Sequence, residues 1–283
     1  MTLLTTRELI DLLAADRPVR VLDIRWSLAE PDGSAAFAAG HIPGAVYVDL
    51  ETELGDHSVS GRGRHPLPSG ADLQASLRRA GVNDGDTVVT YDDWNRAGSS
   101  RAWWVLRAAG LTDVHILDGG LGAWTAAGEQ LESGTVEAEP GSVALPHPDL
   151  YAGSLPTLTA EEAAKVPGTG VLLDARAPER FRGEVEPVDS VAGHIPGAQN
   201  LPSTSLLAAD GTFRPVAELQ QTFATLGVDG NRPAGAYCGS GVTAAVVLAA
   251  ADAAGVDLAL FPGSWSQWSS NPDHPVEVGD GRN

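Results

Sequence analysis

The chain has only one cysteine among its 283 residues, and only 18 lysines and arginines against 37 aspartates and glutamates. A single cysteine excludes an internal disulfide and a zinc site built on several cysteines. The formal charge of −19 gives the chain no general electrostatic attraction to nucleic acid or to an anionic membrane surface. We therefore expect neither nucleic acid nor a membrane as a partner.

Long hydrophobic runs are also missing. The longest apolar stretch, residues 244–251, ends at Asp252 and is too short to span a bilayer. The first residues carry Glu8 and Asp11, where a signal peptide would need a basic end and an apolar core. These absences predict a cytoplasmic protein, in which the lone thiol stays reduced.

The composition is that of a globular protein, with 43% hydrophobic and 19% charged residues. At ~150 residues per domain, the length predicts two domains. The 33 glycines and 19 prolines indicate many turns in an α/β chain.

Three segments of the sequence occur twice, in the same order and at a nearly constant spacing. The motif Val-Leu-Asp-Ile-Arg returns as Leu-Leu-Asp-Ala-Arg, and Ala-Gly-His-Ile-Pro-Gly-Ala returns unchanged. The paired segments are 21–25 and 172–176, 39–45 and 192–198, and 117–124 and 261–268. A spacing this long indicates two copies of one domain, because a solenoid repeats at a much shorter period.

The repeat divides the chain into two domains and a connection. We expect residues 1–128 to form the first domain and residues 157–275 the second. Residues 129–156 are rich in Gly, Pro, Glu and Ser, without periodicity, and are interpreted as a linker. Residues 276–283 are expected to form a C-terminal tail.

Short apolar runs alternate with helix-like segments in each copy, which predicts a doubly wound, mainly parallel sheet with helices on both faces. The expected strands are 19–24, 87–91, 114–117, 171–174 and 258–261, and the expected helices are 6–15, 71–80, 99–109, 217–226 and 243–254. The strand before Cys238 has weak β propensity and is placed by the repeat alone. Ligands of such sheets bind beyond the carboxyl ends of the strands, where Asp92 and Cys238 are expected.

Cys238 begins the run Cys-Gly-Ser-Gly-Val-Thr between a strand and a helix. A glycine-rich turn can direct backbone N–H groups at the sulfur, and the following helix adds the positive end of its dipole. Both effects favour the thiolate, and Ser240 and Thr243 could add hydroxyl donors. The alternative is that the cysteine is a small buried hydrophobe.

Two other cysteine chemistries fit less well. A tyrosine-phosphatase-type loop needs an arginine to grip phosphate, and this chain has Ala244 at that position. A cysteine protease needs a histidine and an asparagine in a suitable context, and no such pair stands out.

These motifs together resemble the tandem-domain rhodanese-type sulfurtransferases, over residues 5–127 and 157–272. Both copies carry Asp-x-Arg followed by Gly-His-Ile-Pro-Gly-Ala, and the Cys238 loop occurs only in the second. The resemblance implies a catalytic second domain and an inactive first one. Asp92 stands at the cysteine position of the first copy, and a carboxylate cannot carry sulfane sulfur.

The resemblance also implies a mechanism. The Cys238 thiolate attacks the outer sulfur of a small anionic donor and becomes a persulfide. A thiol, cyanide or reduced thioredoxin then removes the sulfur, so ping-pong kinetics are expected. No cofactor and no metal is expected, because the sequence has no calcium-binding loop and no cluster of histidine and glutamate.

The loop indicates which donor is used. Family members that prefer thiosulfate tend to carry basic residues after the cysteine, whereas this chain has Gly239 and Ser240. The resemblance therefore favours 3-mercaptopyruvate, with a relay of Ser240, His41 and Asp32. A structural role for His41, pinning the loop of its motif, stays open.

An arginine should hold the carboxylate of the donor, and Arg180 matches the family position. A second arginine is expected just beyond Glu186, but this chain has Val188. Thiosulfate therefore stays open as the donor, and Arg62 or Arg64 could supply the missing cation. The expected substrate-binding residues are Arg180, Gly239, Gly241, Val242 and Thr243.

Other prominent residues are interpreted as structural. Arg25 and Arg176 are expected to pair with Asp23 and Asp174, and the tryptophans at 103, 104, 124 and 268 to pack inside the protein. A non-catalytic sulfur-carrier or regulatory binding module is the alternative from another functional class. The intact cysteine loop argues against that alternative, because a mere binder needs no thiol.

Overall fold

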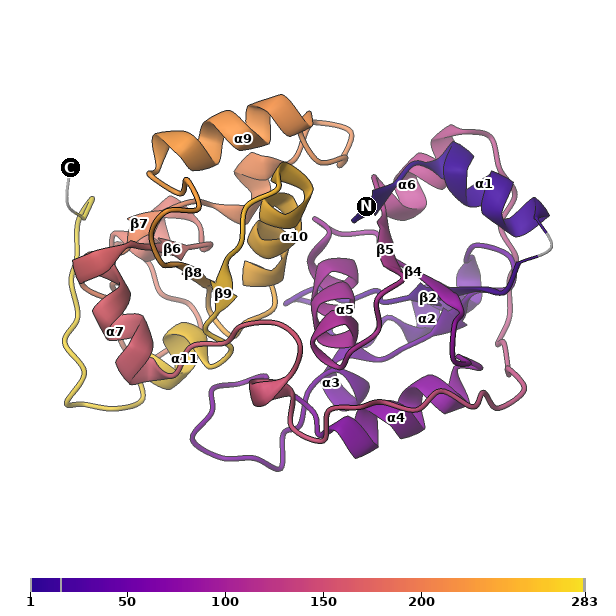
Figure 1. Ribbon diagram of the computed structural model, residues 1–283, viewed down its shortest axis with the longest axis horizontal. Coiled ribbons are helices and arrows are strands. Elements are labelled where there is room, and N and C mark those ends of the chain that lie inside the picture. Colours follow the sequence, from indigo (N-terminus) through magenta and orange to yellow (C-terminus); the bar gives the residue numbers. More distant parts are fainter. Residues whose placement is uncertain (1, 16, 282–283) are drawn as a thin grey trace. The chain divides into compact units, whose positions relative to one another are not determined.

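The computed structural model describes residues 2–15 and 17–281, and the chain divides into two compact units (Figure 1). The first unit contains residues 1–56, 67–155 and 207–213. The second contains residues 57–66, 156–206 and 214–283. Each unit is built around one parallel sheet.

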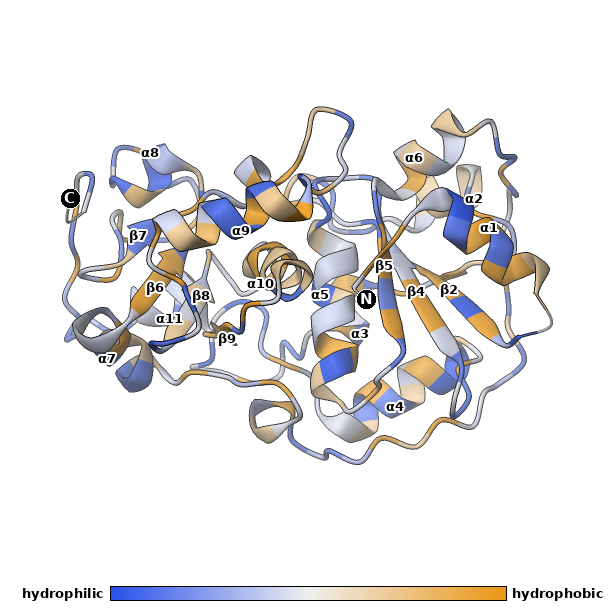
Figure 2. Cartoon of the chain, turned by 45° about the horizontal axis from the view of Figure 1, so that its top comes forward, coloured by the Kyte–Doolittle hydropathy of each residue, from blue (hydrophilic) through white to orange (hydrophobic). Residues whose placement is uncertain are grey.

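The first unit has a five-stranded sheet with the order β1-β5-β4-β2-β3. Its strands are β1 (Leu3–Leu4), β2 (Val19–Asp23), β3 (Val46–Tyr47), β4 (Thr87–Tyr91) and β5 (Val114–Leu117). Its helices are α1 (Thr6–Ala14), α2 (Ser34–Ala39), α3 (Leu50–Glu53), α4 (Gly70–Arg79), α5 (Ala97–Ala108) and α6 (Gly120–Ala126), and η1 (Leu150–Ala152) is a 3₁₀ turn. The central strand β4 is buried along its whole length, as expected for a parallel sheet covered on both faces. The hydrophobic residues of β2, β4 and β5 are seen in Figure 2.

The second unit has a four-stranded sheet with the order β7-β6-β8-β9. Its strands are β6 (Val171–Asp174), β7 (Gln199–Asn200), β8 (Ala234–Tyr237) and β9 (Ala259–Leu260). Its helices are α7 (Ala160–Thr169), α8 (Pro178–Phe181), α9 (Val216–Thr225), α10 (Ala244–Ala254) and α11 (Ser264–Trp268), and η2 (Ser203–Leu206) is a 3₁₀ turn. Helix α9 packs on α10, and α11 packs on α7.

Local sequence explains where these helices begin and end. Thr5 and Glu8 form a capping box at the start of α1, and Thr159 and Glu162 form the same box at α7. Helix α10 is rich in alanine, the best helix former, and ends at Gly255 with a left-handed backbone. The expected alternation of strands and helices in an α/β fold is confirmed.

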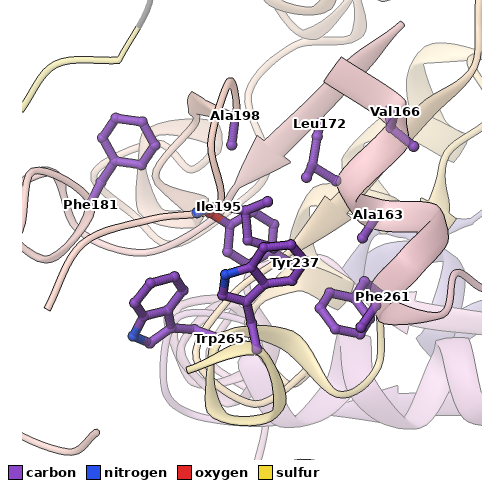
Figure 3. Packing of buried hydrophobic residues seen from close by; sticks show 11 residues of the cluster. Ala163, Val166, Leu172, Phe181, Ile195, Ala198, Tyr237, Phe261 and Trp265 are labelled. Atoms are coloured by element: carbon purple, nitrogen blue, oxygen red, sulfur yellow. The ribbon is translucent and has the colours of Figure 1, made fainter. Parts of the chain in front are cut away.

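The core of the second unit is a cluster of aromatic and aliphatic side chains between β6, β8 and the helices α7 and α11 (Figure 3). Its large members are Phe181, Tyr237, Phe261, Trp265 and Trp268, and each is at most 2% exposed. The Tyr237 hydroxyl accepts a hydrogen bond from the backbone N–H of Ile195, so a polar tip inside the core has a partner.

A buried ion pair lies at the carboxyl end of β2 and another at that of β6. The Arg25 Nη2–Asp23 Oδ2 distance is 2.9 Å, and the Arg176 Nη2–Asp174 Oδ2 distance is 2.6 Å. Both arginines also donate to backbone carbonyls, at Gly40 and at Gly193. The expected pairing holds these arginines in the architecture of the fold.

The units exchange two short segments relative to the division expected from the repeat. Residues 57–66 belong to the second unit and residues 207–213 to the first. Residues 129–155, expected as a linker, run along the first unit, where the backbone N–H of Val143 donates to Val82. The sequence does not predict these assignments, because they depend on contacts with residues far away in the chain.

No helix in residues 2–15 and 17–281 combines the length and the apolar character needed to cross a bilayer. The longest apolar stretch of the sequence lies in α10, which is 11 residues long.

Candidate active site

Cys238 directly follows β8, at the carboxyl edge of the second sheet. The strand register pairs Tyr237 with Asp174, so the cysteine begins the next turn. Its backbone N–H donates to Ser264 Oγ at 3.1 Å, and its carbonyl accepts from the Trp265 N–H at 3.0 Å. The side chain is only 1% exposed. The thiol therefore occupies a fixed position at the edge where ligands of such sheets bind.

The turn after the cysteine holds the sulfur. The Gly241 N–H donates to Cys238 Sγ at 3.1 Å, with Gly241 at a φ of 82°. A Cβ on Gly241 would lie 2.4 Å from the Pro262 carbonyl oxygen, so no larger residue fits. Val242 is buried, and Thr243 is the residue that caps α10 at its N-terminus. The Gly241 N–H thus belongs to the backbone cradle that was expected to favour a thiolate.

The side chain of Ser240 contacts a histidine that was not expected at the site. The Ser240 Oγ lies 2.7 Å from His65 Nδ1, and the two residues are 7% and 6% exposed. His65 comes from the segment 57–66, which belongs to the second unit. At this distance a proton can move between the serine hydroxyl and the imidazole.

Two guanidinium groups lie beside Gly239, the residue after the cysteine. A Cβ built on Gly239 would be 3.1 Å from Arg64 Nη2 and 3.6 Å from Arg180 Nη1. Arg180 comes from the short helix α8, and Arg64 from the same segment as His65. The absent side chain of Gly239 leaves the two cations next to the cysteine loop, which suits an anionic ligand.

Both of these arginines form ion pairs with carboxylates. The Arg180 Nη2–Glu186 Oε1 distance is 2.6 Å, and Asp189 forms ion pairs with Arg180, at 3.6 Å, and with Arg64. Burial raises the pKa of Asp189, against the opposing effect of Arg64. Burial acts on Glu186 in the same direction, but hydrogen bonds from Arg180 and the backbone hold the pKa of Glu186 below its usual value. Val188 is exposed, and its N–H donates to Glu186.

His41 and Asp32, which were expected to form a relay with Ser240, both have contacts inside the first unit. His41 is fully buried, its Nδ1 lies 2.9 Å from the Phe37 carbonyl oxygen, and its ring stacks on Phe37 at 3.9 Å. The histidine of the second copy, His194, has the same stacking and the same carbonyl contact, with Phe181. Because both copies use this histidine alike, it pins the turn of its motif.

Asp32 is exposed and lies in the turn before α2. Its Oδ1 accepts a hydrogen bond from the Ser34 backbone N–H at 2.9 Å. Hydrogen bonding to Ser34 lowers the pKa of the Asp32 carboxyl. The aspartate thus fixes the entry to a helix, which is a frequent local role of this residue type.

Comparison with known proteins identifies the family. A family model described as a rhodanese-like domain matches residues 5–127 and 159–271. The chain belongs to the rhodanese family. The expected resemblance to tandem-domain rhodanese-type sulfurtransferases is thereby confirmed, including its two copies of one domain.

Relatives of known name extend along almost the whole rhodanese chain. It is 58% identical to SseB of Mycobacterium tuberculosis (strain ATCC 25618 / H37Rv), whose name places it among thiosulfate sulfurtransferases, with 98% of this chain and 97% of that one covered. It is 38% identical to the 3-mercaptopyruvate sulfurtransferase of Escherichia coli (strain K12), with 93% of each chain covered. The crystal structure of Escherichia coli SseA matches with a TM-score of 0.81 and 33% identity, covering 94% of this chain and all of that one.

In the first rhodanese copy, the loop that corresponds to the cysteine loop holds an aspartate bound by neighbouring side chains. Asp92 follows β4 as Cys238 follows β8. Its Oδ2 accepts from the N–H and the hydroxyl of Ser99, at 2.8 and 2.7 Å, and its Oδ1 lies 2.9 Å from Arg96 Nη2. The first loop is thus closed by its own side chains.

The four tryptophans interpreted as structural pack inside the rhodanese units. Trp103 and Trp104 of α5 are at most 2% exposed, and Trp124 and Trp268 are at most 4% exposed. The last two occupy repeated positions, and each donates its indole N–H to a backbone carbonyl, of Gln130 and of Pro275.

Proposed function

We propose that this protein transfers sulfur from 3-mercaptopyruvate to a thiol or to cyanide, through a persulfide on Cys238. The observation that carries the proposal is the meeting of three groups within the second unit. The cysteine sulfur accepts a hydrogen bond from the Gly241 N–H. The Ser240 hydroxyl contacts His65, and two guanidinium groups lie beside Gly239.

The first half-reaction moves one sulfur atom. The Cys238 thiolate attacks the donor sulfur, an S–S bond forms, and the C–S bond of the donor breaks. The electron pair of that bond passes to the donor carbon, which takes up the proton released from the donor thiol. Pyruvate leaves, and a cysteine persulfide remains. Atoms and charges balance without a cofactor.

The arginines bind the donor in this scheme. The donor has a carboxylate and a keto oxygen, and both are acceptors for a guanidinium. Arg180 has the position expected from the family, and Arg64 supplies the second cation in place of Val188. We infer that the donor carboxylate displaces Asp189 from Arg64, because the two carboxylates compete for one guanidinium.

The Ser240–His65 pair moves the proton. The imidazole accepts or donates at Nδ1, and the serine hydroxyl connects it to the donor sulfur and carbon. Neither group bonds to sulfur itself. Their hydrogen bond of 2.7 Å supports this role because proton transfer requires such a short path.

The second half-reaction returns the cysteine to its thiolate. An acceptor thiolate or cyanide attacks the outer sulfur of the persulfide and breaks the S–S bond. We propose a small thiol or reduced thioredoxin as the acceptor, and a cytoplasmic location, where the one thiol remains reduced. The first unit is non-catalytic in this scheme, because Asp92 replaces the cysteine.

Thiosulfate is the second candidate donor, and a specific observation favours it. Two guanidiniums beside Gly239 suit a dianion, even though the residues directly after the cysteine are uncharged. Thiosulfate releases sulfite and needs no proton at carbon, so Ser240 and His65 would be dispensable for that donor.

Steady-state kinetics with both donors test the proposal. We expect kcat/KM for 3-mercaptopyruvate to exceed that for thiosulfate by about tenfold or more, the effect of one charge-assisted or proton-transfer contact. A chain that prefers thiosulfate would overturn the donor assignment. A chain that loads no sulfur from either donor would instead favour a carrier or regulatory module.

A further inference from the structure

The first unit has a pocket of about 220 Å³ at the carboxyl edge of its own sheet. The register pairs Asp23 with Tyr91 in the first sheet and Asp174 with Tyr237 in the second. The pocket is therefore lined in part by the residues that follow β4, where the second unit has the sulfur-transfer loop after β8. Its lining includes Arg25, Trp26, Glu30, Asp93 and Trp94.

The lining of this pocket has a charge opposite to that of the sulfur-transfer loop. By the strand register, Asp93 replaces Gly239 and Trp94 replaces Ser240. The second unit has two guanidiniums beside Gly239, whereas the pocket in the first unit has the carboxylates of Asp93 and Glu30. An anionic sulfur donor would be repelled here.

Arg25 does not cancel this negative charge. Arg25 is the positively charged residue of the described lining, and its Nη2 lies 2.9 Å from Asp23 Oδ2. Its other N–H groups donate to the carbonyls of Ala36 and Gly40. Asp93 lies 4.0 Å from the same guanidinium, and Glu30 adds a further exposed carboxylate. The balance at the pocket is therefore negative.

Two indole rings form a corner of the pocket. The ring centroids of Trp26 and Trp94 are 6.2 Å apart, and their planes meet at 64°. The indole N–H of Trp26 donates to Glu51 at 2.5 Å, which fixes the orientation of its ring. Trp94 is 38% exposed, an unusual position for so large an apolar side chain. Electron-rich ring faces attract cations that carry alkyl groups.

We propose that this pocket binds a small alkylammonium ion. The ring faces contact the alkyl groups, and Asp93 and Glu30 neutralise the charge. The lining has two carboxylates beside its indole rings, whereas a calcium ion takes about six to eight oxygen ligands, so an organic cation fits better than a metal ion. The non-catalytic copy has then retained the ligand position of the fold and exchanged an anion site for a cation site.

Nuclear magnetic resonance of the indole N–H groups tests the proposal on the full chain. Tetramethylammonium chloride is the probe, sodium chloride at equal ionic strength controls for salt, and tert-butanol is a neutral ligand of similar shape. We expect saturable shifts of the Trp26 and Trp94 signals with tetramethylammonium alone. Absence of saturable shifts, or equal binding of tert-butanol, overturns the proposal.

Variants assign the binding to the pocket. Trp94→Leu should weaken tetramethylammonium binding by about threefold to fivefold, read from the Trp26 signal, as expected for loss of one cation–π contact. Asp93→Asn and Glu30→Gln should each weaken it, whereas Glu137→Gln, at an exposed carboxylate outside the pocket lining, should not. Unchanged affinity in Trp94→Leu would overturn the proposal, provided that the remaining indole signals show a folded chain.

Discussion

The Oγ of Ser240 lies 2.7 Å from Nδ1 of His65, although the two residues are far apart in the sequence. The contact gives the cysteine loop an imidazole that can transfer protons, a group that the loop residues themselves do not have. It also separates the two candidate donors, because only 3-mercaptopyruvate requires a proton at carbon when its sulfur leaves.

Ser240→Ala should slow turnover of 3-mercaptopyruvate by about 100-fold and leave thiosulfate turnover nearly unchanged, since positioned proton transfer contributes about this much. His65→Gln should have the same selective effect. The measurement is kcat with each donor. His41→Gln is the matched control. His41 contacts the backbone carbonyl of Phe37, so this variant should lower the melting temperature and leave kcat unchanged. Equal losses for both donors in Ser240→Ala would contradict the relay.

Arg64→Ala should raise KM for 3-mercaptopyruvate by about tenfold or more, because a hydrogen bond to a charged group contributes about 1.5–3 kcal/mol. Arg62→Ala is the control, since Arg62 is an exposed neighbour in the same segment. Steady-state kinetics of the two variants distinguish a donor-binding cation from general surface charge. Equal KM values in both would exclude Arg64 from donor binding.

Asp189→Asn should tighten the binding of anionic donors by about fivefold near pH 7, because it removes a carboxylate that competes for Arg64. In the native loop, burial raises the pKa of Asp189, so this carboxyl takes up a proton earlier than usual as the pH falls. Protonation releases Arg64, and donor affinity should therefore rise as the pH falls through that range.

The measurement is thiosulfate affinity by calorimetry at several pH values, in the Cys238→Ser background, where no sulfur is transferred. The pH dependence should be smaller with Asp189→Asn, and any slope that remains belongs to groups other than Asp189. Weaker binding in Asp189→Asn would show that the carboxylate positions Arg64 rather than competing for it.

Asp92→Cys should not create a second working site. Ser99 and Arg96 bind the Asp92 carboxylate, and Trp94 stands where the second loop has Ser240. A thiol there would lack both the cation pair and the serine–histidine contact. The intact mass after incubation with donor should still show one added sulfur per chain. Two added sulfurs, with turnover about doubled, would contradict this reading of the first loop.

The sequence predicted the fold well where strands are long and apolar. Strands β2, β4 and β6 appear close to their expected bounds, because buried parallel strands read as continuous apolar runs. The strands β1, β3 and β7 have two residues each, too few for a pattern, and were not expected. Strand β8 was found only through the repeat, because glycine and alanine give it no β propensity.

The sequence predicted the site only in part. Cys238, Gly239, Ser240 and Arg180 come together around one loop, as their shared motifs suggested. His65 was missed because its segment packs with the second unit, a tertiary relationship with no local signal. His41 was the more prominent histidine, yet the presence of the same motif in both copies was itself the sign of a structural role.

The central claim is that Cys238 carries the transferred sulfur, and the intact mass of the protein tests it most directly. Incubated with 3-mercaptopyruvate, the native chain should gain the mass of one sulfur atom, and cyanide should remove it. Cys238→Ser should gain nothing and remain folded, because a hydroxyl is a poor nucleophile and cannot hold a sulfane sulfur. A sulfur adduct on Cys238→Ser, or full turnover by that variant, would contradict the account.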